Sequence, residues 1–243
     1  MEKRALTIAV ISLVAGIAIG FLVANRLNRS ELETLRSENA RLKTPAEKGP
    51  DDGPTLSNEE IQARIKKADD NPADLEYQKN LGIALYRYAS MKKDVPLLNE
   101  STRLLKRVRA ADPSGFDINV ALGNAYFDIG YFGQDSPAFA AARDYYETAL
   151  RSKPDAAVRT DYGLTYFLQD PPDNQRAVSE FAAALKSDPK NEKALEFSVQ
   201  AYRKLGDHAN ARRSLDALRA VNASSPSLAG LESAIAPNSQ AAK

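Results

Sequence analysis

Hydrophobic and polar residues follow two different patterns along this chain. Residues 5–24 form an uncharged apolar run of 20 residues, interrupted only by Thr7 and Ser12. From residue 57 to residue 235, apolar residues instead recur at intervals of three and four, the period of an amphipathic helix. The two patterns predict one long apolar helix followed by a series of shorter helices that share a core.

The apolar run is long enough to cross a membrane. At a helical rise of about 1.5 Å per residue it spans roughly 30 Å, the thickness of the hydrocarbon core. A cleaved signal peptide is the alternative, but Leu22 stands where the cleavage site needs a small residue. We expect residues 1–4 to be a short tail and residues 5–25 to be a transmembrane helix in a bacterial inner membrane.

The basic residues around this helix give conflicting signals about its orientation. Lys3 and Arg4 precede the helix, and more basic residues follow it, at Arg26, Arg29, Arg36, Arg41 and Lys43. This count favours a cytoplasmic C-terminal part, whereas a short basic start before an apolar segment is the usual order of a signal anchor. We expect the part that follows the anchor to lie on the periplasmic side, with the opposite orientation as the alternative.

Residues 26–43 form a predicted amphipathic helix with features of chain pairing. Residues 30–33 are a capping box, a heptad seam follows, and small residues recur every fourth position in the apolar run before it. A parallel homodimer and a solvated spacer are both compatible with this pattern. The predicted dimerisation residues are Gly16, Gly20, Ala24, Leu32, Leu35, Asn39 and Leu42. Residues 44–56, rich in proline, glycine and charge, predict a flexible linker.

The remaining chain is repetitive. Prolines mark the phase, at positions 72, 113, 154 and 189, with spacings of 41, 41 and 35 residues. A Leu-Gly or Tyr-Gly pair follows each of the first three prolines, and its glycines are Gly82, Gly123 and Gly163. A glycine inside a helix has a packing role where a neighbouring helix approaches closely. An aspartate followed by proline then predicts the start of a second helix in each unit, at residues 94–96, 135–137 and 170–172.

These residues resemble the tetratricopeptide repeat family, whose unit is a helix hairpin of about 34 residues. The resemblance implies an all-α, helical-hairpin repeat solenoid behind the transmembrane helix. We expect a capping helix at 57–71, units at 72–113, 114–154, 155–189 and 190–224, a closing helix within 72–235, and a disordered tail at 236–243. The fourth unit departs from the pattern, with Ser198-Val199 in place of Leu-Gly.

Units one and two also depart from the pattern, because both have five extra residues after their glycine-containing helix. These residues are 89–93 and 130–134. A shared extension on one edge is either a functional rim or a family-specific loop. We expect a loop.

The resemblance implies that the first helices line a concave face that holds an extended or helical peptide. The residues expected on this face are Lys79, Ile83, Tyr86, Arg87, Ala121, Asn124, Phe127, Asp128, Thr160, Leu164, Phe167, Phe197, Gln200, Arg203 and Lys204. For the aromatic residues Tyr86, Phe127 and Phe167, packing between hairpins is an equal alternative. Anchor and repeats together resemble bacterial envelope assembly factors, including accessory proteins of c-type cytochrome maturation and translocon-associated chaperones.

Composition narrows the possible chemistry. The chain has 33 basic and 32 acidic residues, which argues against a general nucleic-acid binder. It has no cysteine, so disulfides and thiolate zinc sites are excluded, and its one histidine, His208, is expected in a surface turn. We expect no cofactor, metal, small-molecule substrate or enzymatic activity. The predicted function is a membrane-anchored scaffold or adaptor for a polypeptide client, with a dimerising structural subunit of a membrane complex as the alternative.

Overall fold

The computed structural model of the protein describes residues 57–236, which form ten helices and no strand. The helices are α2 (Asn58–Asp70), α3 (Leu75–Lys92), α4 (Val95–Ala111), α5 (Phe116–Gly133), α6 (Ser136–Ser152), α7 (Ala156–Leu168), α8 (Asn174–Ser187), α9 (Glu192–Lys204), α10 (His208–Val221) and α11 (Leu228–Ile235). None of these helices has the length and apolar character that crossing a membrane requires. The predicted membrane helix, the seven dimerisation residues, the linker and residues 237–243 lie outside the described part of the chain, so they stay predictions.

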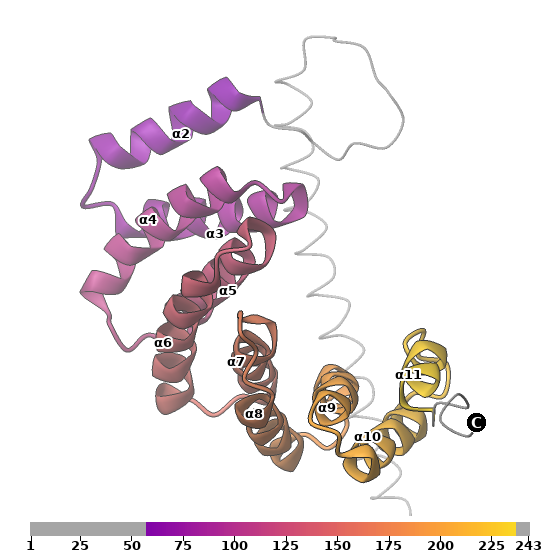
Figure 1. Ribbon diagram of the computed structural model, residues 1–243. Coiled ribbons are helices and arrows are strands. Elements are labelled where there is room, and N and C mark those ends of the chain that lie inside the picture. Colours follow the sequence, from indigo (N-terminus) through magenta and orange to yellow (C-terminus); the bar gives the residue numbers. More distant parts are fainter. Residues whose placement is uncertain (1–56, 237–243) are drawn as a thin grey trace, which may run out of the picture. The chain divides into compact units, whose positions relative to one another are not determined.

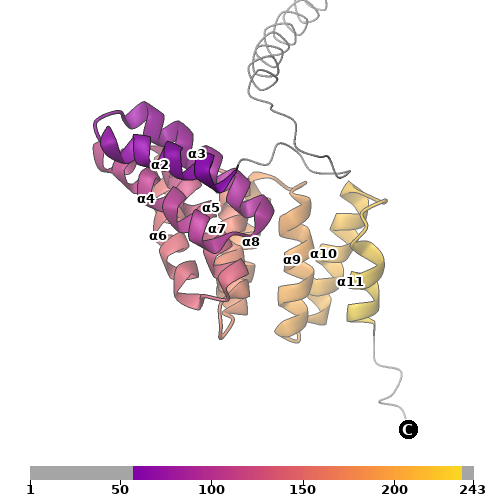
Figure 2. The ribbon, with the colours of Figure 1, turned by 90° about the horizontal axis from the view of Figure 1, so that it is seen from above.

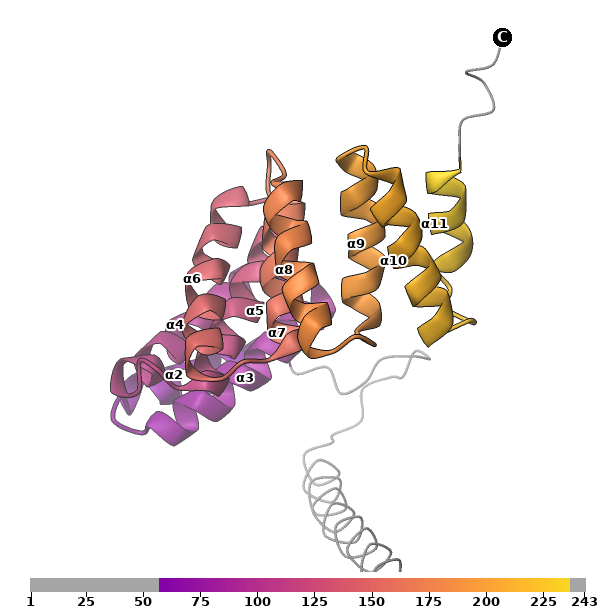
Figure 3. The same ribbon diagram turned by 90° about the horizontal axis from the view of Figure 1, so that it is seen from below.

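The helices pair into consecutive hairpins, α3–α4, α5–α6, α7–α8 and α9–α10, with α2 before them and α11 after them (Figure 1). The first helices α3, α5, α7 and α9 each contact the next one along the chain, and they lie on the inner side of the curved stack. The second helices lie on the outer side, and the views from above and below show the same order (Figures 2 and 3). The predicted all-α repeat architecture is therefore confirmed.

Short polar side chains fix the helix starts. Ser57 and Glu60 form a capping box at the start of α2, and Asp94 caps α4 by accepting a hydrogen bond from the backbone N–H of Leu97. The prediction that Asp170 opens the second helix of unit three is wrong. Asp173 is the N-cap of α8. Asp170 lies in the turn before α8, where its backbone N–H donates a hydrogen bond of 2.9 Å to the Ser136 hydroxyl.

The glycine of each Leu-Gly or Tyr-Gly pair faces the second helix of its own hairpin. A Cβ atom on Gly82 would lie 2.9 Å from Leu105, and one on Gly123 would lie 2.5 Å from the Tyr146 ring. On Gly163 it would lie 2.8 Å from the Phe181 ring. Each contact is closer than a side chain allows, so the glycines let the two helices of a hairpin approach, as the sequence predicts. In unit four the buried Val199 replaces the glycine.

Four of the five extra residues in each of units one and two are helical, so the prediction of a loop is wrong. Helices α3 and α5 each have 18 residues, whereas α7 and α9 each have 13. Buried residues explain the added turn, because Ala89 and Gly130 pack in the interior and Gly130 lies directly against Phe139. Both helices then end at a left-handed residue, Lys93 with φ 55° and Gln134 with φ 52°.

Each end of the repeat stack is covered by a single helix. Ile61 and Ile65 of α2 share a core cluster with α3 and α4, and Asp69 accepts hydrogen bonds at 2.7 Å from both Arg103 and Arg107 of α4. The two guanidinium groups lower the pKa of Asp69. At the other end, the apolar residues of α11 close a cluster with α9 and α10. The apolar ends of the solenoid are thereby shielded from water.

Candidate functional site

Polar side chains from four consecutive hairpins lie close together along the first helices. Asp161 of α7 accepts a hydrogen bond from the ammonium of Lys193 of α9 at 2.7 Å. Asp128 of α5 interacts electrostatically with Asp161 and with Lys193, and Tyr86 of α3 interacts with both aspartates. We call Tyr86, Asp128, Asp161 and Lys193 the inner row. It joins the helices that form the inner side of the stack.

The least satisfied member of the inner row is Asp128. Its side chain is half-buried and interacts with Ser90, but its Oδ2 atom is buried without a hydrogen-bond partner. Burial raises the pKa of Asp128, Asp161 raises it further, and Ser90 and Lys193 oppose the shift. A partly desolvated carboxyl with an unpaired oxygen costs folding free energy, and groups of this kind are concentrated at functional surfaces.

Two neighbours of Asp128 supply hydrogen-bond donors. Burial raises the pKa of Tyr86 to about 12, and both Asp128 and Asp161 add to this shift, so the phenol keeps its proton at neutral pH. Asn124 accepts a hydrogen bond at 2.8 Å from the buried hydroxyl of Tyr146. This bond occupies the amide oxygen of Asn124 and leaves its NH2 group to donate. The row and the adjacent Asn124 therefore offer both hydrogen-bond donors and carboxyl acceptors.

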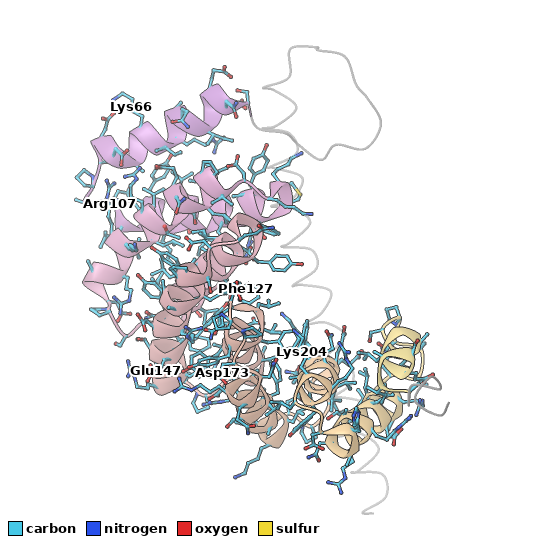
Figure 4. The ribbon with its side chains drawn as sticks, in the orientation of Figure 1. Lys66, Arg107, Phe127, Glu147, Asp173 and Lys204 are labelled. Carbon is cyan, nitrogen blue, oxygen red and sulfur yellow. The ribbon has the colours of Figure 1, made fainter. Side chains whose placement is uncertain are left out.

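The structure distributes the predicted face residues over three environments. Arg87, Arg203 and Lys204 are exposed, and the ammonium of Lys204 lies 4.3 Å from the centre of the Phe167 ring. Half-buried residues are Lys79, Ile83, Tyr86, Ala121, Asn124, Phe127, Asp128, Phe197 and Gln200. Figure 4 shows Phe127 and Lys204 on the inner side of the stack and Glu147 on the outer side.

The third environment is the core. It corrects the expected positions of Thr160 and Leu164, and for Phe167 it agrees with the alternative of packing between hairpins. All three are at most 5% exposed. The Thr160 hydroxyl accepts a hydrogen bond from Asn191 at 3.2 Å, so it fastens the start of α9 to α7. Leu164 and Phe167 pack in the cluster that contains Phe181. The inner surface of α7 is instead provided by Asp161, which sequence reasoning missed.

A second group of residues was also missed, on the added turns of α3 and α5. Met91 is 67% exposed and Tyr131 is 57% exposed. Among the described residues, only Leu205 joins them as a large apolar side chain of comparable exposure. The Tyr131 ring lies 6.5 Å from Phe127 and 5.4 Å from Phe132, measured between ring centres. The sequence signal for this group was the shared five-residue extension itself.

The outer side has a shallow hollow of about 500 Å³ between α4 and α6. Stacked rings of Tyr126 and Tyr145 form part of its wall, with Lys106 over one ring and Arg109 over the other. Basic and acidic side chains line it together, so its charge selects no ligand class. In residues 57–236, no set of three His, Asp or Glu side chains is placed to hold a metal ion.

No protein-family model and no curated protein matches this sequence. Solved structures do match. MamA MSR-1 C2 is 19% identical with a TM-score of 0.54, over 68% of this chain and 86% of that one. A second MamA structure is 21% identical with the same TM-score, over 68% of this chain and 87% of that one. TTC0263, a thermophilic TPR protein in Thermus thermophilus, is 18% identical with a TM-score of 0.52, over 72% of this chain and 89% of that one. At these identities the likeness concerns the fold alone, and residues 57–236 have the helical-repeat fold of tetratricopeptide proteins.

Proposed function

We propose that this protein is a scaffold that binds a polypeptide segment of a client protein along the inner side of its repeats. The observation that carries the proposal is the inner row, in which four consecutive hairpins each contribute one polar side chain to a mutually interacting group. Neighbouring helix axes lie about 8–10 Å apart, so four first helices span roughly 25–30 Å. An extended chain covers that distance with about eight residues.

The chemistry of the row suits a peptide backbone. A peptide presents N–H and C=O groups at regular intervals. The row and the adjacent Asn124 offer donors at Tyr86, Asn124 and Lys193 and carboxyl acceptors at Asp128 and Asp161. A small-molecule site instead gathers a few polar groups into one concave pocket. The proposal therefore assigns the protein no catalytic step and no cofactor.

The cellular setting is a further part of the proposal. The uncharged run at residues 5–24 supports a membrane anchor, and the short basic start before it favours export of the repeats to the periplasmic side. A client-binding solenoid in that place suits envelope protein assembly, such as c-type cytochrome maturation or chaperoning beside a translocon. A reporter that is active only outside the cytoplasm, fused after Lys243, tests this setting, and an inactive reporter with an active cytoplasmic counterpart would discard it.

Site-specific photo-crosslinking tests the binding face in the full-length chain. A photoreactive amino acid replaces Arg87 in α3 or Gln200 in α9, and matched positions on the outer side are Lys186 in α8 and Arg213 in α10. We expect client polypeptides to crosslink from the two inner positions and not from the two outer ones. Equal crosslinking from all four positions would exclude the inner row as the binding face.

A further inference from the structure

The added turns of α3 and α5 form one continuous edge of the fold. Phe132 packs in the cluster that contains Ala89 and Val95, and a Cβ atom on Gly133 would lie 3.7 Å from Val95. The end of α5 is therefore held against the turn between α3 and α4. We call the exposed residues of this edge, Arg87, Met91, Lys93 and Tyr131, the rim.

The rim exposes apolar surface that the fold does not require. Met91 and Tyr131 have most of their surface in water, while the adjacent Phe127 and Phe132 hold the Tyr131 ring in place. An aromatic side chain with a fixed ring contributes contact area at little cost in conformational entropy, which is why such residues are frequent anchors of binding surfaces.

The exposed charge of the rim is basic. Arg87 and Lys93 are exposed, and no ion pair is found for either of them among residues 57–236. On the inner side, the carboxyl of Asp128 is half-buried and has a raised pKa. Asp94 and Asp135 follow the two added turns as the N-cap residues of α4 and α6, where the positive helix ends favour a carboxylate. Asp94 accepts a hydrogen bond from the backbone N–H of Leu97, whereas Asp135 is exposed and makes no side-chain capping hydrogen bond.

We infer that the rim binds an acidic polypeptide segment that also carries an aromatic or large aliphatic side chain. Tyr131 and Met91 provide the apolar contact, and the planar guanidinium of Arg87 suits a carboxylate with two parallel hydrogen bonds. The inference rests on the proposed function, because it assigns a chemistry to the client segment at the α3–α5 end of the inner face. The inference is tested by whether the rim prefers an acidic segment over a basic one.

Two labelled peptides of equal length test the inference by fluorescence anisotropy on the full-length protein. Both contain Leu and Phe at the same positions, one with Glu and the other with Lys between them. We expect the acidic peptide to bind roughly tenfold or more tightly than the basic one. Arg87→Glu and Tyr131→Ala should each weaken the acidic peptide by roughly tenfold or more.

Matched controls lie away from the rim. Lys186→Glu reverses an exposed cation on the outer side, and Leu205→Ala removes the third exposed apolar side chain. Neither change should alter binding of the acidic peptide. The inference is overturned if the basic peptide binds as well as the acidic one, if neither binds, or if the rim variants bind the acidic peptide normally. It is also overturned if Tyr131→Ala dissolves an oligomer without changing peptide binding, because the rim is then a contact between copies of this chain.

The two proposals fail in different ways. Crosslinks to a client from Gln200 do not depend on the rim, so their presence alongside equal binding of both peptides would leave the proposed function standing and remove the rim preference. Rim-dependent binding of the acidic peptide, with client crosslinks equal from Gln200 and the outer positions, would keep the rim and remove the inner row.

Discussion

The hairpins α3–α4 and α5–α6 differ from α7–α8 and α9–α10 at one end of their first helices. In the interior the units are similar, since α3, α5 and α7 each place a glycine against the second helix and α9 packs the buried Val199 in a cluster with α10. At the end, α3 and α5 continue for five more residues than α7 and α9 do. The comparison teaches that interior packing determines how the two helices of a hairpin meet. The length of the first helix past that contact varies independently, and it changes which side chains are exposed.

The largest expected difference in stability is between a substitution in the shared interior and one in the added turn. Phe181→Ala removes a fully buried ring and should lower the free energy of unfolding by about 3–5 kcal/mol. Tyr131→Ala removes an exposed ring and should change it by less than about 0.5 kcal/mol. Urea unfolding followed by helical circular dichroism measures both. Comparable losses would mean that the added turn supports the fold rather than only the surface.

The glycine contacts provide the next test. Gly123→Ala forces a methyl group into the Tyr146 ring and should cost about 1–3 kcal/mol of unfolding free energy. Gly163→Ala, in a unit without the added turn, should cost a similar amount because its contact with Phe181 is of the same kind. Gly230→Ala in α11 is the control, since nothing lies within 4 Å of its Cβ position. It should stabilise the protein by up to about 1 kcal/mol through helix propensity, and a loss there would contradict the packing explanation.

Substituting the unpaired carboxyl of the inner row, Asp128, should stabilise the protein rather than destabilise it. Because the pKa of Asp128 is raised in the folded state, its contribution to stability is present below the unfolded pKa, about 4, and is lost as the pH rises through the folded value. Asp128→Asn should therefore raise the unfolding free energy at pH 7 by about 1 kcal/mol or less, and leave it nearly unchanged in acid. Asp161→Asn is the counterpart, because it breaks the ion pair with Lys193 and should lower stability by about 0.5–1 kcal/mol. Unfolding curves at several pH values distinguish the two, and a destabilised Asp128→Asn variant would show that the charge is favourable.

The architecture was predictable because its determinants are local and repeated. The spacing of prolines gives the period, the glycines mark the helix crossings, and the Ser57 capping box gives the start of α2. Candidate residues of the inner face were predictable only to within a position or two. Thr160 and Asp161 are adjacent in sequence. Which of them is buried and which lies on the inner surface depends on how α9 packs against α7, and no local sequence pattern encodes that packing.

The conformation of the extra residues was not predictable for a related reason. Helix propensity alone does not separate a helical turn from a loop over five residues. Contacts with distant residues decide the matter, such as those of Ala89 with the α4 cluster and Gly130 with Phe139. In unit three, two prolines and two aspartates, Asp170 and Asp173, offer alternative helix starts, and the hydrogen bond between Ser136 and Asp170 favours the later one.

The smallest expected effect lies at the residues that end the long helices. Lys93 ends α3 and Gln134 ends α5 in the left-handed region, where an L side chain costs about 1 kcal/mol or more. Glycine adopts this region freely but loses more conformational entropy on folding. Lys93→Gly and Gln134→Gly should therefore each stabilise the protein by about 0.5 kcal/mol, as measured by urea unfolding.

Unit four, whose first helix α9 lacks the added turn, supplies the matched control for these helix ends. Gly206, with φ 75°, follows α9 and already occupies the left-handed region with the favoured residue. Gly206→Ala should cost about 1 kcal/mol, because this reverse exchange removes glycine from a left-handed position. If Lys93→Gly instead destabilises the protein, the Lys93 side chain contributes a favourable contact of its own. The long helices would then owe their ends to side-chain interactions at the rim, and the rim would be a structural feature as well as a binding surface.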